Sequence, residues 1–185
     1  MSRSERTEIR LSGAGGQGLI LAGVILAEAA IIDNYNAVQS QSYGPEARGG
    51  ASKSDVVISK KDILYPKASK LDYLLALNQE SCDNYAPALK DEGILFVDSD
   101  TVEHLPPGKF VTLPLVRTAR DTVGRVVTTN ILSLGVIVGV TNVVTRKAIK
   151  EAVLNRIPKG TEKLNMKALD MGYEMGKEAA IEMQY

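Results

Sequence analysis

The feature that most constrains this chain is a glycine-rich hexapeptide between a strand-like run and a long apolar segment. The hexapeptide is Gly13-Ala14-Gly15-Gly16-Gln17-Gly18, with residues 7–11 before it and residues 19–32 after it. Its spacing satisfies G-x-G-x-x-G, in which the glycines permit a sharp turn and a close approach of backbone to phosphate. Because the first N–H groups of a helix are unpaired and its dipole is positive there, this glycine loop predicts an anion-binding site.

A second glycine-containing motif follows the next predicted strand, residues 36–41. It reads Gln41-Ser42-Tyr43-Gly44-Pro45-Glu46-Ala47-Arg48-Gly49-Gly50. Its proline fixes one backbone dihedral, its glycines permit unusual ones, and the guanidinium of Arg48 could reach a phosphate or a carboxylate. The alternative is a structural turn in which Arg48 pairs with Glu46 or with solvent, and both readings stay open.

Strand-like and helix-like segments alternate along the chain without an internal repeat or a second-domain boundary. This alternation predicts an α/β fold: a single domain, residues 1–185, with a three-layer Rossmann-like arrangement, a mostly parallel sheet and helices on both faces. Residues 51–59 read as a strand at the margin of the sheet and residues 71–77 as a central strand buried on both faces. Further along, we expect a helix at 79–89, a turn at 91–93, strands at 94–98 and 110–115, and helices at 116–123, 131–140, 145–156 and 161–182.

Two of the predicted helices, residues 18–32 and 131–140, are apolar on almost every side. Such helices must be covered all round, either within the domain or by a partner. Gly135 and Gly139 lie four residues apart in the second helix and predict close packing against another backbone, while Thr128-Thr129-Asn130 could cap its start. In the last helix an apolar stripe predicts either core or a partner surface; it comprises Leu164, Ala168, Met171, Met175 and Ala179.

Composition excludes several classes of protein. Lys+Arg and Asp+Glu both total 22, so no excess of basic charge points to nucleic acid. The single cysteine, Cys82, excludes a disulfide framework and an iron–sulfur cluster ligated by this chain alone. It reads as a small buried helix residue or, alternatively, as a reactive thiol near a helix start. No segment is long and apolar enough to span a membrane, and the polar N-terminus lacks a signal peptide, so we expect a cytoplasmic protein.

The chain shows no evident catalytic group. Asp98, Ser99 and Asp100 could suggest a metal site but are more typical of turns and helix caps. His104 is the only histidine and has no obvious nucleophile beside it. A dinucleotide-binding unit would carry an acid near the end of the second strand, where this chain has Gln39 and Gln41. The sequence therefore favours no NAD site, no metal site and no catalytic residue in this chain.

Together, the glycine loop and the second motif closely resemble those of one family. Residues 7 to the final helix are similar to the gamma subunit, or the equivalent fused domain, of the 2-oxoacid:ferredoxin oxidoreductases. The second motif is the more specific of the two. The resemblance implies an enzyme that oxidatively decarboxylates a 2-oxoacid onto coenzyme A and reduces ferredoxin. It also implies that thiamine diphosphate, Mg²⁺ and the iron–sulfur clusters are held by partner subunits.

On this resemblance the chain has no redox centre and is inactive alone, and it helps to position coenzyme A and to assemble the alpha, beta and, where present, delta subunits. The implied binding residues, for the phosphates of coenzyme A or for a subunit interface, come from both motifs: Gly13, Gly15, Gly16, Gln17, Gly18, Ser42, Tyr43, Gly44, Pro45, Glu46, Arg48 and Gly49.

The short chain, beginning Thr7-Glu8-Ile9-Arg10-Leu11-Ser12-Gly13, looks most like the subunits of 2-oxoglutarate enzymes. Pyruvate, branched-chain and aryl 2-oxoacids remain as alternatives. A different function, a stand-alone nucleotide-binding Rossmann-like module, also stays open. An isolated gamma-type subunit would be expected to associate with itself, for example as a homodimer, or to be poorly soluble, whereas a binding module would be monomeric and stabilised by its ligand.

Overall fold

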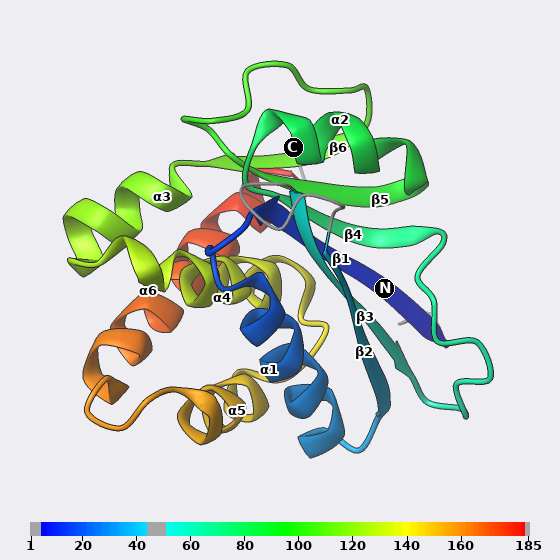
Figure 1. Ribbon diagram of the computed structural model, residues 1–185, viewed down its shortest axis with the longest axis horizontal. Helices are drawn as coiled ribbons and strands as arrows, with labels where there is room; N and C mark the ends of the chain where they lie inside the picture. Colours follow the sequence, from blue (N-terminus) through cyan, green and yellow to red (C-terminus); the bar gives the residue numbers. More distant parts are fainter. Residues whose placement is uncertain (1–4, 44–50, 184–185) are drawn as a thin grey trace.

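All strands of the computed structural model, which describes residues 5–43 and 51–183, lie in one six-stranded sheet (Figure 1). The strand order is β2-β3-β1-β4-β5-β6. The strands are β1 (Arg6–Ala14), β2 (Asn36–Tyr43), β3 (Ala51–Ser59), β4 (Leu71–Ala76), β5 (Leu89–Asp98) and β6 (Lys109–Leu113).

The pairings β1–β4, β4–β5 and β5–β6 are parallel, whereas β3 is antiparallel to both of its neighbours, β1 and β2. The predicted mostly parallel sheet is therefore confirmed. One strand position was wrong: β3 was expected at the margin of the sheet, but it lies between β2 and β1, and β2 is the edge strand.

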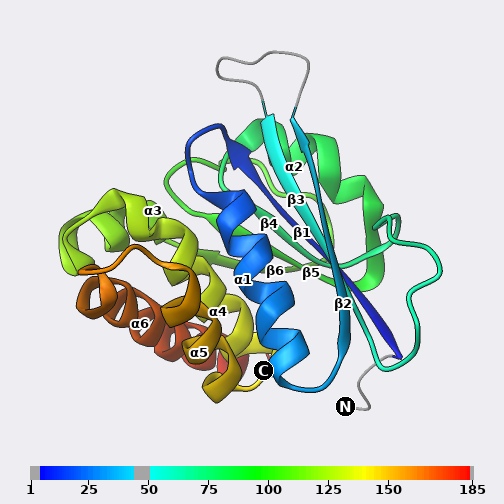
Figure 2. The ribbon, with the colours of Figure 1, turned by 60° about the horizontal axis from the view of Figure 1, so that its bottom comes forward.

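Helices lie on both faces of the sheet, as predicted (Figures 1 and 2). One face is covered by α1 (Leu19–Ile32), α4 (Thr129–Thr141), α5 (Arg146–Arg156) and α6 (Glu162–Glu182), and the other carries α2 (Gln79–Tyr85). Shorter helical segments are η1 (Ala86–Ala88), α3 (Leu115–Arg117), η2 (Thr118–Val123) and η3 (Val126–Thr128).

Alternation along β1 builds two different interiors. Ile9 and Leu11 are fully buried in the larger core beneath α1, α4 and α6. The side chain of Arg10, between them in sequence, lies on the other face, where its guanidinium forms two hydrogen bonds of 2.7 Å to the carboxylate of Asp55 on β3. Both faces of the sheet therefore carry a buried hydrophobic cluster, and the face of the smaller cluster also holds this buried ion pair.

Helices α4 and α6 cross at very short range because both carry glycines at the crossing. A Cβ atom added to Gly135 would lie 2.4 Å from the carbonyl oxygen of Leu169, and one added to Gly172 would lie 2.0 Å from that of Leu132. The predicted backbone approach at Gly135 and Gly139 is confirmed, and its partner is α6. The apolar stripe of α6 also packs into this core.

The two apolar helices, α1 and α4, are covered by other elements of this chain. Every residue of α4 from Thr129 to Gly139 is buried, between α1, α3 and α6. Helix α1 is covered by β1, β2, β3, α4 and α5. No partner chain is needed to cover α4, so the composition of these helices does not by itself argue for one.

Three local predictions were wrong. The helix expected at 79–89 ends at Tyr85 and continues only as the short turn η1, because Pro87 and the start of β5 follow. The turn expected at 91–93 is an irregularity within β5, where the β4 register shifts between Leu71 and Tyr73. Of the residues 128–130 expected to cap α4, Thr128 does not cap it, but the side-chain oxygen of Asn130 accepts from the N–H of Ile131 (2.8 Å).

Candidate functional site

The glycine loop lies at the edge of the sheet where open α/β folds bind ligands. The chain leaves the end of β1 toward α1 on one face, and leaves the end of neighbouring β4 toward α2 on the other face (Figure 2). Such a divergence produces a crevice at the carboxyl ends of the two strands. The hydroxyl of Ser12 donates to the carbonyl of Leu75 (2.7 Å), and the N–H of Leu77 donates to the carbonyl of Ser12 (3.0 Å), so both strands are tied together at this edge.

Within the loop, β1 extends through Gly13 and Ala14 before the chain turns. The N–H of Ala14 donates to the side-chain Oε1 of Gln17 (2.8 Å), which folds the loop back on itself. A Cβ at Gly13 would lie 2.2 Å from that same oxygen, so a side chain there would displace Gln17. Gly15 and Gly16 are exposed at the tip of the loop.

Gly18 is the residue from which α1 starts. Its φ of 71° and ψ of 22° are left-handed, a conformation that glycine adopts without strain. Its carbonyl accepts hydrogen bonds from the N–H of Ala22 (3.1 Å) and from the side-chain amide of Asn130 (3.1 Å). The sequence interpretation treated Asn130 as a helix cap and missed this contact, because nothing local marks a pairing across 112 positions.

The start of α1 has no capping side chain, and no acidic residue occupies its first turn. The first N–H groups of the helix are therefore not bonded by a capping side chain, and the positive end of the helix dipole favours an anion. The strand, the glycine turn and the helix start follow one another as the sequence predicted, and anion binding at this helix start stays a prediction.

The second motif is attached to the sheet beside the glycine loop. Strand β2 ends with Ser42 and Tyr43, whose register partners on β3 are Lys53 and Ser52. Strand β3 begins at Ala51, which is the partner of Ala14 at the end of β1. The structure therefore brings the ends of both motifs to one edge of the sheet. The candidate residues Gly44, Pro45, Glu46, Arg48 and Gly49 lie outside the described residues.

The insertion of β3 explains why an acid is missing where a dinucleotide-binding unit would have one. In such a unit the second strand lies directly beside the first. Here the end of β2 is two strand spacings away from β1, about 10 Å. Gln39 has a structural contact instead, because its side-chain amide donates to the hydroxyl of Ser54 (2.9 Å).

The carboxylates after β5 have structural roles. Asp98 is fully buried, and its carboxylate accepts from the N–H of Val116 (2.9 Å) and from the hydroxyl of Thr101 (3.0 Å). Asp100 pairs with Arg117 at 3.3 Å. Among residues 5–43 and 51–183, no cluster of three or more His, Cys, Asp or Glu side chains could hold a metal ion. Asp98 is therefore a cap, the interpretation that the sequence favoured.

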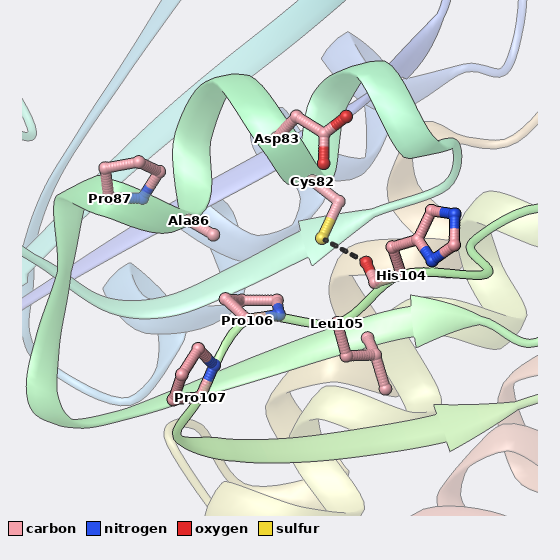
Figure 3. A pocket seen from close by; sticks show the side chains of 8 residues that line it. All are labelled: Cys82, Asp83, Ala86, Pro87, His104, Leu105, Pro106 and Pro107. Atoms are coloured by element: carbon pink, nitrogen blue, oxygen red, sulfur yellow. Dashed lines mark hydrogen bonds between the residues drawn. The ribbon is translucent and has the colours of Figure 1, made fainter.

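A pocket of about 530 Å³ lies on the α2 face (Figure 3). Its wall is mostly apolar, with Leu105, Pro106 and Pro107 opposite Ala86 and Pro87. It contains no residue of the glycine loop, and no motif in the sequence predicts it.

Cys82 also lines this pocket. The thiol is buried and donates to the backbone carbonyl of His104 over 3.9 Å. Burial, together with the negative charge of Asp83, raises the pKa of the Cys82 thiol. A raised pKa disfavours the thiolate, so the structure supports the buried, unreactive interpretation of this cysteine.

The fold is that of a Rossmann-like domain, with a glycine loop at the edge of the sheet where the connections from β1 and β4 diverge to opposite faces. A family model described as pyruvate ferredoxin/flavodoxin oxidoreductase matches residues 8–175, and the chain belongs to this family. The chain is 48% identical to 2-oxoglutarate synthase subunit KorC of Methanocaldococcus jannaschii, over 94% of this chain and 95% of that one.

Solved structures agree with this assignment. A keto/oxoacid ferredoxin oxidoreductase gamma subunit from Geobacter sulfurreducens superposes with a TM-score of 0.87 at 52% identity, covering 95% of this chain and 99% of that chain. The 2-oxoglutarate:ferredoxin oxidoreductase of Magnetococcus marinus, solved with 2-oxoglutarate, coenzyme A and succinyl-CoA bound, has the same fold (TM-score 0.83, 19% identity) over 95% of this chain and 32% of that chain.

Proposed function

We propose that this chain is the gamma-type subunit of a 2-oxoglutarate:ferredoxin oxidoreductase. The complex would convert 2-oxoglutarate and coenzyme A to succinyl-CoA and CO₂, with the electrons passing to ferredoxin. The observation that supports this most strongly is the 48% identity to a 2-oxoglutarate synthase subunit along nearly the whole of both chains. The pyruvate synthase subunit PorC of Methanocaldococcus jannaschii is only 29% identical to this chain, which favours 2-oxoglutarate over pyruvate.

In this proposal residues 1–185 form one domain that contributes binding and architecture rather than redox chemistry. Thiamine diphosphate, Mg²⁺ and the iron–sulfur clusters would be held by the alpha, beta and, where present, delta subunits. Ferredoxin would bind to the assembled complex. Among the described residues no helix is long and apolar enough to cross a membrane, and we place the working complex in the cytoplasm.

The glycine loop and the second motif are the proposed contact with coenzyme A. The open start of α1 offers N–H groups and a positive dipole end to a phosphate, and the backbone of Gly15 and Gly16 is exposed beside it. Arg48 belongs to the segment that joins β2 to β3, which starts and ends at this same edge. Its guanidinium would add a charge-assisted contact to a phosphate.

Substitution of Arg48 in the assembled complex tests this assignment. Loss of a charge-assisted contact costs about 1.5–3 kcal/mol, so Arg48→Ala should raise the KM for coenzyme A by about tenfold or more. The KM for 2-oxoglutarate should stay within twofold of the wild-type value. Lys177→Ala, which removes an exposed positive charge from α6, is the control and should leave both constants unchanged. The assignment fails if Arg48→Ala changes neither the KM for coenzyme A nor assembly of the complex.

A further inference from the structure

We propose that the outer edge of β2 pairs with β2 of a second copy of this chain, in an antiparallel and two-fold symmetric arrangement. The paired edges would join two six-stranded sheets into one continuous sheet. This inference does not rest on the proposed function, because it depends only on the edge of the sheet.

Register along the chain identifies the backbone groups that face outward. The N–H of Lys60 donates to the carbonyl of Glu5 (3.3 Å), so residues 52, 54, 56 and 58 of β3 direct their hydrogen-bonding groups to β1. The alternate residues of β3 bond to β2. Their partners on β2 are the even-numbered residues, so the odd-numbered residues 37, 39, 41 and 43 direct their N–H and C=O groups away from the sheet.

The sequence of β2 lacks the devices that usually protect an edge strand. The strand reads Asn-Ala-Val-Gln-Ser-Gln-Ser-Tyr, eight residues without a charge or a proline. Its pairing with β3 is continuous from Asn36 to Tyr43, without a bulge. Exposed edges of this kind favour pairing with another strand. The opposite edge, β6, has five residues, begins at Lys109 and is followed by Pro114.

A second copy suits this edge because an uncharged strand meets itself without like-charge repulsion. The two-fold register that pairs all four outward-facing residues centres on Ser40. It places Ser40 opposite its own counterpart and Gln39 opposite Gln41 of the partner copy. The Ser40 pair would be of the non-hydrogen-bonded type, with Cα atoms about 4.5 Å apart.

A matched pair of variants at Gln41 distinguishes the contribution of its backbone N–H to dimerisation from that of its side chain. Gln41 is exposed, and its outward N–H makes no ladder bond to β3. Gln41→Pro removes that N–H and should weaken dimerisation of the purified chain about tenfold or more, measured by sedimentation equilibrium. Gln41→Ala keeps the N–H and should dimerise within about twofold of the wild type.

Cysteine cross-linking tests the register without relying on the proline variant. Under copper–phenanthroline oxidation, two thiols at Ser40→Cys should join as an intermolecular disulfide, because the predicted Cα separation falls in the range for such bonds. Val38→Cys should not cross-link, because its counterpart would lie four residues away along the strand. The native Cys82 is buried and should not cross-link, so the wild-type chain is the control.

Three results would overturn the proposal: a chain that stays monomeric at tens of micromolar, a dimer in which Gln41→Pro folds and associates normally, or cross-linking at neither or both cysteine positions. Pairing of β2 with a strand of another subunit, seen as cross-linking of Ser40→Cys only to that subunit in the assembled complex, would also replace the second copy as its partner.

Discussion

At the scale of single residues, the glycine loop is defined by two positions that look equivalent in sequence but differ in surroundings. Gly16 and Gly18 both have positive φ, 87° and 71°. A Cβ at Gly16 meets no atom within 4 Å, whereas one at Gly18 would lie 2.5 Å from the side-chain amide nitrogen of Asn130. Glycine is thus favoured at position 16 by backbone conformation alone, whereas at position 18 it is favoured by both backbone conformation and the packing of Asn130.

This difference predicts unequal costs of substitution. Gly16→Ala should lower the free energy of unfolding by about 1–2 kcal/mol, the cost of a left-handed non-glycine residue. Gly18→Ala should cost about 1 kcal/mol more, because Asn130 must move and give up its hydrogen bond to the Gly18 carbonyl. Urea unfolding measures both. The extra cost should vanish in an Asn130→Ala background, and equal costs in the wild type would contradict the contact.

Glu8 gives a prediction for pH dependence. Burial alone would raise the pKa of this carboxyl, but hydrogen bonds from the side chain of Arg6 and from the N–H groups of Lys70 and Ser69 outweigh burial and hold the pKa below its ordinary value of 4.5. Because the pKa of Glu8 is lower in the folded state than in the unfolded state, ionised Glu8 stabilises the fold. This stabilisation is complete above the unfolded-state pKa and is lost as pH falls through the folded-state pKa.

The free energy of unfolding of the wild type should therefore fall as pH drops below about 4.5, and the fall should be smaller in Glu8→Gln. Urea unfolding at pH 6 and at pH 3.5 measures this difference. Glu178→Gln, which removes an exposed carboxylate from α6, is the control, and its free energy of unfolding should change between the two pH values by as much as that of the wild type. A pH dependence unchanged by Glu8→Gln would show that the carboxylate of Glu8 does not stabilise the fold.

At the scale of elements, α4 and α6 pack backbone against backbone where they cross. Gly172→Ala should gain about 1 kcal/mol of helix propensity, yet its Cβ would lie 2.0 Å from a backbone oxygen of α4 that cannot move alone. The helices would have to separate, so we expect a net loss of about 1–3 kcal/mol.

Thermal or urea unfolding checks this result. Glu178→Ala on the same helix is the matched control, and we expect it to change stability by less than about 0.5 kcal/mol. If Gly172→Ala were neutral or stabilising, the two helices would not be in contact at the distance that the structure shows.

The sequence predicted best those elements whose signal is local. The apolar runs of α1, β4 and α4 and the periodic stripe of α6 each specify an element and its burial. The order of the strands was not predictable in the same way, because the alternation in β3 reads alike at the margin of a sheet and inside it. The turn expected near Gly93 failed for a related reason, since glycine also marks irregularities within a strand.

The candidate site was predictable in part. Strand, glycine turn and helix start are consecutive in sequence, so their geometry follows from local rules. Asn130 lies 112 positions from its partner Gly18 and carries no local sign of that contact. Residues 44–50 were singled out by their glycines, proline and Arg48 and by family resemblance, and their part in the site remains a prediction.

At the scale of the whole molecule, the account requires this chain to work inside a larger assembly. Both motifs are attached at one edge of the sheet. The family is one of oxidoreductases, and the relatives of similar length are subunits of a complex. In the proposed function, this chain would supply a binding surface to chemistry that other subunits perform.

The most direct test is purification of the tagged chain from its native host without oxygen, followed by assay of the eluate. The assay follows coenzyme A-dependent reduction of a viologen dye with 2-oxoglutarate, pyruvate and 2-oxoisovalerate in parallel. The account predicts co-purifying subunits and reduction with 2-oxoglutarate in clear excess over the other two acids. Activity with pyruvate or 2-oxoisovalerate instead would contradict the substrate, and a chain that purifies alone and inactive would contradict the central claim.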